Sequence, residues 1–110
     1  ADAYYNRGNA KDDLKDYYGA IADFTKAIEL DPDDASAYYN RGRCYIFIKE
    51  YDNAINDFSK CIRLNPDYEN AYFARGIAKE RSGKSYCNDY KKACNMGIEI
   101  ACEFYYKKCK

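Results

Sequence analysis

The residues of this chain whose types and spacing could support chemistry are four cysteines placed symmetrically about Gly97. Cys94 and Cys102 flank that glycine, Cys87 lies seven residues before the first, and Cys109 lies seven residues after the second. Seven residues are two helical turns, so the two cysteines on each side share one helix face. In a helical hairpin that turns at Gly97, facing Cα atoms would be roughly 4–5.5 Å apart, which overlaps the disulfide range of about 4.4–6.8 Å.

We therefore expect two disulfides, Cys94–Cys102 and Cys87–Cys109. Free thiols are the alternative, because cysteine can also serve as a small buried residue, the role that we assign to Cys44 and Cys61. A single four-cysteine zinc site is disfavoured. The two layers of cysteines differ by about 10 Å along the helix axis, whereas all four sulfurs must lie about 2.3 Å from the metal.

Other catalytic chemistry has little support in the sequence. The chain has no histidine, the commonest general base and metal ligand. It has no glycine-rich phosphate loop, serine-nucleophile elbow or paired-carboxylate motif. The acidic pairs Asp12-Asp13 and Asp33-Asp34 fall at expected turns or helix ends, where water solvates them. The sequence predicts that the protein is not an enzyme and needs no metal or cofactor.

The elements that position these residues belong to a repeat of 34 residues. Residues 3–36 and 37–70 are identical at 17 of 34 positions, and a third copy opens at Ala71. Each copy holds two stretches with helical spacing of apolar residues, about 3–14 and 18–30 in the first copy. The second stretch ends before Pro32 or Pro66, because the residue before proline is pushed out of helical geometry. A fixed period of this length indicates stacked helix–turn–helix units.

The third copy, residues 71–97, is two residues shorter at its turn. We expect Ser85 to cap its second helix and Gly97 to end that helix in a left-handed conformation. Residues 98–109 keep helical spacing and should fold back as a terminal capping helix. The sequence thus predicts one all-α domain over residues 1–110, with about seven antiparallel helices.

Two sets of residues recur in step with the repeat and need a structural reason. A glycine inside the first helix costs about 1 kcal/mol relative to alanine, so its recurrence predicts close approach of a neighbouring helix. An arginine before it should pair with an aspartate across the antiparallel helices, and such pairs set geometry more reliably than they stabilise. Contact between these arginines and a ligand is the alternative. The two sets are Gly8, Gly42 and Gly76, and the pairs Arg7–Asp23, Arg41–Asp57 and Arg75–Asp89. In the first helix of the first copy, the stripe that we assign to the core is Ala3, Tyr4, Gly8, Ala10 and Leu14.

Together these positions resemble the tetratricopeptide repeat family. The matching residues are an aromatic, the glycine, a tyrosine after the turn, a small residue and a phenylalanine: in the first copy Tyr4, Gly8, Tyr17, Ala20 and Phe24. The resemblance implies a right-handed superhelix whose concave face, lined by the first helix of each pair, holds a peptide. The arginine before the glycine departs from the family's usual leucine. The stretch ACNMGIEIAC around Gly97 also resembles cysteine-rich Sel1-like repeats, in which such cysteine pairs are bridged.

The resemblance directs attention to the side chains on the concave face. Tyr5, Tyr39 and Phe73 recur at one position and should form a ladder of rings, with asparagine amides beside them to bond a peptide main chain. The alternative is that these rings pack between helices and only frame the groove. The expected ligand contacts are Tyr5, Asn9, Tyr39, Asn40, Arg43, Phe47, Phe73, Ile77 and Arg81.

Some family members bind a C-terminal carboxylate with a clamp of two lysines, two asparagines and a further cation. The asparagines match Asn9 and Asn40. The cations would fall at Tyr5, Asn70 and Ala74, and none of these residues is basic. Binding of a chaperone tail through such a clamp is therefore not expected, although Arg43 and Arg81 could meet an acidic ligand.

Charge is distributed unevenly along the chain. The balance is −5 over residues 1–34 (4 basic, 9 acidic), +1 over 35–68 (5 and 4) and +4 over 69–110 (9 and 5). The simpler interpretation is that the charged residues lie on solvated faces and imply no partner. The alternative is weak head-to-tail association, in which the acidic end of one molecule contacts the basic end of another. The acidic first third argues against nucleic acid, and no apolar run is long enough for a membrane span. No secretion signal is recognisable, and the sequence does not indicate a compartment.

These observations predict a protein-interaction scaffold that binds an extended peptide or partner segment in its concave groove, without catalysis. The alternative function is a structural repeat unit that associates end to end.

Overall fold

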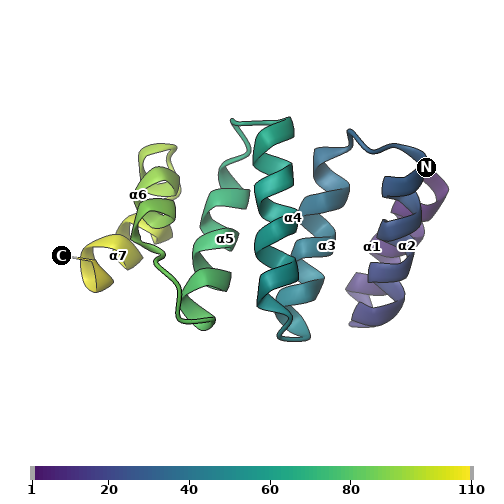
Figure 1. Cartoon of the computed structure of the whole chain (residues 1–110), viewed down its shortest axis with the longest axis horizontal. Helices are drawn as coiled ribbons and strands as arrows, with labels where there is room; N and C mark the ends of the chain where they lie inside the picture. Colours follow the sequence, from purple (N-terminus) through teal and green to yellow (C-terminus); the bar gives the residue numbers. More distant parts are fainter. Residues whose placement is uncertain (1, 110) are drawn as a thin grey trace.

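The computed structural model describes residues 2–109 and contains seven α-helices within that range. They are α1 (Asp2–Asp13), α2 (Tyr17–Leu30), α3 (Ala35–Phe47), α4 (Tyr51–Leu64), α5 (Glu69–Arg81), α6 (Cys87–Asn95) and α7 (Glu99–Lys108). They follow one another along the 43 Å long axis, with the chain ends at opposite ends of the molecule (Figure 1). The predicted all-α fold of stacked helix pairs is confirmed.

A buried aromatic ring from the second helix fills the centre of each helix pair. Phe24, Phe58 and Tyr90 have no exposed surface. Each ring lies directly against the glycine of the first helix: a Cβ built at Gly42 would come within 2.8 Å of the Phe58 ring, and Gly8 and Gly76 have equivalent contacts. The predicted close approach at the glycines is therefore confirmed, and the neighbouring group is a ring rather than a backbone.

Small buried residues join one helix pair to the next. Ala37 and Cys44 on α3 and Ala71 and Ala78 on α5 are fully buried. Cys44 packs in a cluster with Ala20 and Phe24 of the preceding pair. Cys61 is also buried and carries a free thiol, so the structural role assigned to both cysteines is confirmed. Burial raises the pKa of Cys44 and Cys61 to about 12, which keeps both thiols protonated and unreactive at neutral pH.

In the corresponding stripe on α1, Gly8 is buried and Tyr4 is half-buried, but the assignment of the other three residues to the core is wrong. Ala3 and Ala10 are exposed, and Leu14 exposes 80% of its surface. Their counterparts on α3 and α5 are covered by the preceding helix pair. No helix precedes α1 among residues 2–109, so this side of the first pair faces solvent.

Three arginine–aspartate pairs connect the two helices of each unit, as predicted. Their Nη2–Oδ1 distances are 2.8 Å for Arg7–Asp23, 2.7 Å for Arg41–Asp57 and 2.8 Å for Arg75–Asp89. In each pair a second hydrogen bond runs from Nε to the other carboxylate oxygen. The Nη1 atoms of Arg41 and Arg75 also donate to hydroxyls of the preceding pair, Thr25 Oγ1 and Ser59 Oγ, both at 3.1 Å. These arginines thus orient helices both within and between units.

Helices α1, α3, α5 and α6 end with the same hydrogen-bonded motif. After the last turn comes a residue of positive φ, and the next amide bonds to the carbonyl five residues earlier, as from Ile98 N to Ala93 O. Gly97 was predicted to take this conformation, and it does. The prediction for Ser85 is wrong, because α6 begins at Cys87 after Tyr86 and no side chain caps it. The positive-φ residues are Lys15, Lys49, Gly83 and Gly97.

The last two helices form the hairpin that the cysteine spacing predicts. Cys87 is bonded to Cys109 and Cys94 to Cys102, with Cα–Cα distances of 5.8 and 4.6 Å. Cys87 and Cys94 both lie in α6, Cys102 lies in α7, and Cys109 is the residue that follows α7. The bonds fix α7 against the third helix pair. None of the helices within residues 2–109 has the length and apolar composition needed to cross a membrane.

Candidate functional site

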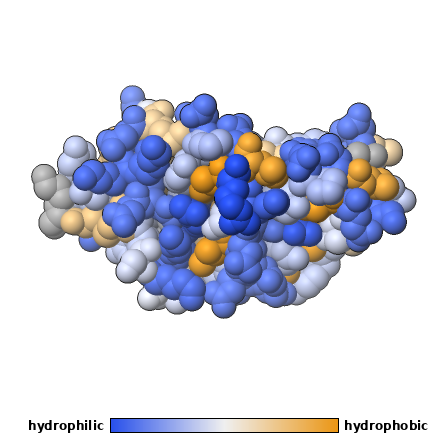
Figure 2. Space-filling model, turned by 45° about the horizontal axis from the view of Figure 1, so that its top comes forward, coloured by the Kyte–Doolittle hydropathy of each residue, from blue (hydrophilic) through white to orange (hydrophobic). Residues whose placement is uncertain are grey.

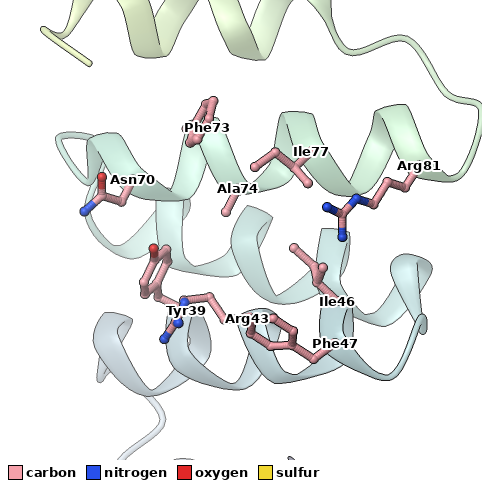
Figure 3. Close-up of a pocket in the computed structure, with 9 residues that line it drawn as sticks. All are labelled: Tyr39, Arg43, Ile46, Phe47, Asn70, Phe73, Ala74, Ile77 and Arg81. Carbon is pink, nitrogen blue, oxygen red and sulfur yellow. The ribbon is translucent and has the colours of Figure 1, made fainter. Parts of the chain in front are cut away.

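A cavity of about 260 Å³ lies between α3 and α5. Figure 3 shows its lining residues arranged along these two facing helices, so its walls are the first helices of the second and third pairs. On the face shown in Figure 2, hydrophobic surface gathers near the middle of an otherwise largely hydrophilic molecule. The lining residues are Tyr39, Arg43, Ile46 and Phe47 from α3, and Asn70, Phe73, Ala74, Ile77 and Arg81 from α5.

The lining combines apolar side chains with two cations. Ile46 and Ala74 are buried and Ile77 is half-buried, whereas Phe47 is exposed and stacks on Tyr17 with ring centroids 4.6 Å apart. Arg43 Nη1 pairs with Asp12 Oδ2 at 3.3 Å. Arg81 is exposed and makes no ion-pair contact within residues 2–109, but its charge acts on the neighbouring Glu80 carboxylate. Such a site can accept an apolar side chain and place a negative charge beside it.

Each of the three repeated rings packs on the buried ring of its own helix pair. The centroid distances are 5.8 Å for Tyr5–Phe24, 5.7 Å for Tyr39–Phe58 and 5.8 Å for Phe73–Tyr90. Tyr39 and Phe73 line the cavity, but in Figure 3 the Phe73 ring points away from α3. Tyr5 lies outside it. All three rings therefore pack between helices, and two of them, Tyr39 and Phe73, also line the cavity.

Asn40 links the first two helix pairs. Its Nδ2 donates to the Tyr5 hydroxyl at 2.9 Å and to Asn9 Oδ1 at 3.3 Å. Neither asparagine lines the cavity. The Asn40 amide and the Asn9 carbonyl, which were expected to bond a peptide main chain, are engaged within the protein.

The structure brings six of the nine predicted contacts to one cavity and leaves Tyr5, Asn9 and Asn40 outside it. It adds Ile46, Asn70 and Ala74, which were not among the expected contacts. Their signal in the sequence is helical spacing: Ile46 follows Arg43 by three positions, and Asn70 precedes Ala74 by four. The six predicted contacts at the cavity are Tyr39, Arg43, Phe47, Phe73, Ile77 and Arg81.

A second cavity of about 270 Å³ lies between α5 and α7 and shares Ile77 and Arg81 with the first. Glu80 lies on its wall, where it accepts hydrogen bonds from Lys108 Nζ at 2.8 Å and from the Tyr90 hydroxyl at 2.6 Å. These bonds, Lys108 first, lower the pKa of Glu80 below its ordinary value, so the carboxylate is ionised at neutral pH. The lining is Ile77, Glu80, Arg81, Tyr90, Phe104 and Lys108.

Several solved structures have the same arrangement of helices. The first TPR of Spaghetti (RPAP3), bound to the HSP90 peptide SRMEEVD, is 26% identical over 96% of this chain and 86% of that chain, with a TM-score of 0.91. The second TPR domain of human RPAP3, in complex with the HSP70 peptide SGPTIEEVD, is 28% identical over 97% and 92%, with a TM-score of 0.90. MamA is 32% identical over 92% of this chain and 60% of its own, with a TM-score of 0.84.

The sequence alone, without the structure, also matches a known repeat family. Residues 1–34 and 35–68 each match the family model described as Tetratricopeptide repeat, and together they cover more than half of the chain. With its period, its glycine-on-ring packing and its stacked helix pairs, the chain belongs to the tetratricopeptide repeat family.

Proposed function

We propose that this protein is an interaction scaffold that binds an extended peptide segment of a partner protein between α3 and α5. The observation that carries this is the cavity in which apolar side chains adjoin Arg43 and Arg81. Its volume of about 260 Å³ suits one or two side chains of a longer ligand better than a whole small molecule, for which pockets of about 300–1,000 Å³ are usual. No catalytic step is involved.

The peptides bound by the two RPAP3 domains support a ligand that is both acidic and apolar. Both end in Glu-Glu-Val-Asp, preceded by Met in one and Ile in the other. In this chain the three positions of the clamp that would need a cation hold Tyr5, Asn70 and Ala74. Recognition would therefore depend on side chains of the ligand, and a free C-terminal carboxylate would contribute little.

Fluorescence anisotropy with labelled SRMEEVD and SGPTIEEVD, each with a free and an amidated C-terminus, tests the proposal. We expect binding that changes by less than about threefold on amidation, a difference of ~0.7 kcal/mol. Phe47→Ser and Ile77→Ser should each weaken it by about tenfold, through loss of roughly 1.4 kcal/mol of apolar contact.

Leu30→Ser is the matched control, because Leu30 and Phe47 expose 53% and 52% of their surfaces and Leu30 lies outside the cavity. The proposal is contradicted if neither peptide binds, or if the two groove variants bind as well as the control does. Strict dependence on the free carboxylate would instead contradict the side-chain mode of recognition.

End-to-end association is a second candidate, favoured by the uncovered stripe on α1. Ala3, Ala10 and Leu14 are exposed at the acidic end of the molecule, while Ile100 is exposed on α7 at the basic end. The occupant would be the α7 end of a second copy, attracted by the opposite charge. Light scattering at low salt should then show a mass that rises with concentration, and Leu14→Asp should abolish the rise. A monomer at all salt and protein concentrations would exclude it.

A further inference from the structure

The two cavities adjoin at α5 and share part of their lining, and we refer to them together as the groove. The first lies between α3 and α5, the second between α5 and α7, and Ile77 and Arg81 line both. A ligand that occupies the first cavity therefore has the second within reach across a single helix.

The capping helix α7 supplies the far wall of this groove. The Phe104 ring packs on Phe73 and Tyr90 at centroid distances of 5.5 Å each, and Lys108 reaches Glu80 on α5. Ala101 is the fully buried residue of α7. A ten-residue helix with so little buried surface would not hold its place alone. The disulfides at its two ends anchor it, so the wall is fixed before a ligand arrives.

Arg81 is the cation available to a ligand at the junction of the cavities. The neighbouring cations are occupied, since Arg43 pairs with Asp12 and Lys108 with Glu80. Arg81 makes no ion-pair contact within the part of the chain that the structure describes, residues 2–109, and the nearby Glu80 carboxylate, which its charge reaches, is itself bonded to Lys108. In Figure 3 it extends from the end of α5 toward Ile46 on α3, at the edge of the first cavity. A carboxylate placed there gains a charge-assisted hydrogen bond without breaking an existing ion pair.

The spacing of the two cavities sets the spacing of the ligand's side chains. A ligand that crosses α5 from one cavity to the other spans about one helix diameter, ~10 Å. A peptide in the extended polyproline II conformation has three residues per turn and rises ~3.1 Å per residue, so side chains three positions apart lie on one face, about 9 Å from each other. We infer that the partner presents an internal segment with two apolar residues three positions apart and acidic residues between them. One apolar side chain enters each cavity, Arg81 binds the acid, and α7 recognises the second apolar residue. This inference rests on the proposed function, whose groove it extends.

Anisotropy with labelled, amidated octapeptides tests it. The reference probe is GSLEELSG; GSLQQLSG removes the acids and GSLEESSG removes the second apolar residue. The wild-type protein should bind GSLEELSG at least about fivefold more tightly than either of the others, as expected for one lost ion pair or apolar contact. Arg81→Gln should remove the preference over GSLQQLSG, and Phe104→Ala should remove the preference over GSLEESSG.

Two variants serve as controls because they alter similar residues outside the groove. Arg63→Gln removes an exposed cation of α4, and Ile100→Ser alters an exposed apolar residue of α7; both should keep the wild-type preferences. Thermal unfolding followed by circular dichroism checks that Phe104→Ala folds. If it does not, the comparison of GSLEELSG with GSLEESSG on the wild-type protein decides for or against the second subsite.

The outcomes separate this inference from the proposed function. Equal binding of GSLEELSG and GSLEESSG by the wild-type protein overturns the second subsite and leaves the first cavity as the binding site. Equal binding of GSLEELSG and GSLQQLSG overturns the role of Arg81. Absence of binding to all three octapeptides, with SGPTIEEVD still bound, overturns the inferred ligand. Only the absence of binding to every peptide would also contradict the proposed function.

Discussion

Removing either disulfide should destabilise the protein by an amount that follows from the residues it encloses. The relevant variants are the double substitutions Cys87→Ser/Cys109→Ser and Cys94→Ser/Cys102→Ser. The sequence separations are 22 and 8 residues. In the chain-entropy relation, loops of these lengths correspond to about 3.4 and about 2.5 kcal/mol at 25 °C.

The two loops are nested, and this lowers the contribution of the outer bond. With Cys94–Cys102 intact, the path between Cys87 and Cys109 shortens to roughly 14 residues, for which the same relation gives about 3 kcal/mol. Because the total for both bonds cannot depend on the order of closure, the inner bond contributes about 2 kcal/mol when the outer bond is intact, so the double variants should lose about 2–3 kcal/mol. For 110 residues the entropy of unfolding near Tm is ~230 cal/mol/K, so the expected fall in Tm is roughly 9–13 °C.

Guanidinium chloride denaturation followed by circular dichroism measures these losses, and hydrogen exchange of the α7 amides shows whether the capping helix opens first. Alkylation of the denatured, unreduced wild-type protein should modify two thiols, those of Cys44 and Cys61. Modification of six thiols, or a loss below about 1 kcal/mol in both variants, would refute the reasoning from loop closure.

Three further predictions concern the helix pairs and their ends. Gly42→Ala should destabilise the folded protein by about 1 kcal/mol, because overpacking against the buried Phe58 ring costs about 1–3 kcal/mol and exceeds the gain in helix propensity. In a Phe58→Leu background the same substitution should be neutral or stabilising. A double-mutant cycle measured by denaturation would show this. Lys49→Gly should raise stability by roughly 0.5–1 kcal/mol. A left-handed conformation costs a residue with a side chain about 1–2 kcal/mol, and part of the gain from removing this cost is offset by the greater backbone entropy that glycine loses on folding. An unchanged or lower denaturation midpoint would contradict the prediction. The pKa of Glu80 is lowered in the folded state, so its pairing with Lys108 should stabilise the protein fully above the ordinary glutamate pKa of about 4.3 and lose this effect as the pH falls through the lower folded value. The difference in Tm between the wild type and Glu80→Gln should therefore shrink between pH 5 and pH 2. A difference that stays constant over this range would contradict the prediction.

Features that recur with the 34-residue period could be predicted well from the sequence. The contact of Gly42 with the opposite helix and the pair Arg41–Asp57 each have counterparts in the other copies, and a residue repeated at some cost indicates a repeated contact. The disulfides could be predicted because their symmetry about Gly97 is itself a geometric constraint on a helical hairpin.

Features that break the period could not be predicted in this way. Leu14 occupies a core position by its pattern, but the pattern does not report that no helix pair covers it within residues 2–109. The hydrogen bonds from Asn40 to Tyr5 and Asn9 depend on how one pair is rotated against the next, which residue types alone do not fix. Phe104 lies on α7, which has no counterpart in the earlier copies, so its contribution to the groove had no repeated signal.

The central claim, that a peptide binds between the first helices of the pairs, is tested most directly by nuclear magnetic resonance. Amide resonances of the labelled protein would be followed while unlabelled GSLEELSG is added. The largest shifts should fall on α3 and α5, at residues such as Phe47, Ile77 and Arg81, and on α7 near Phe104, while the outward-facing residues of α2 and α4 stay unchanged. Shifts confined to α2 and α4, or no shifts in the presence of millimolar peptide, would contradict it.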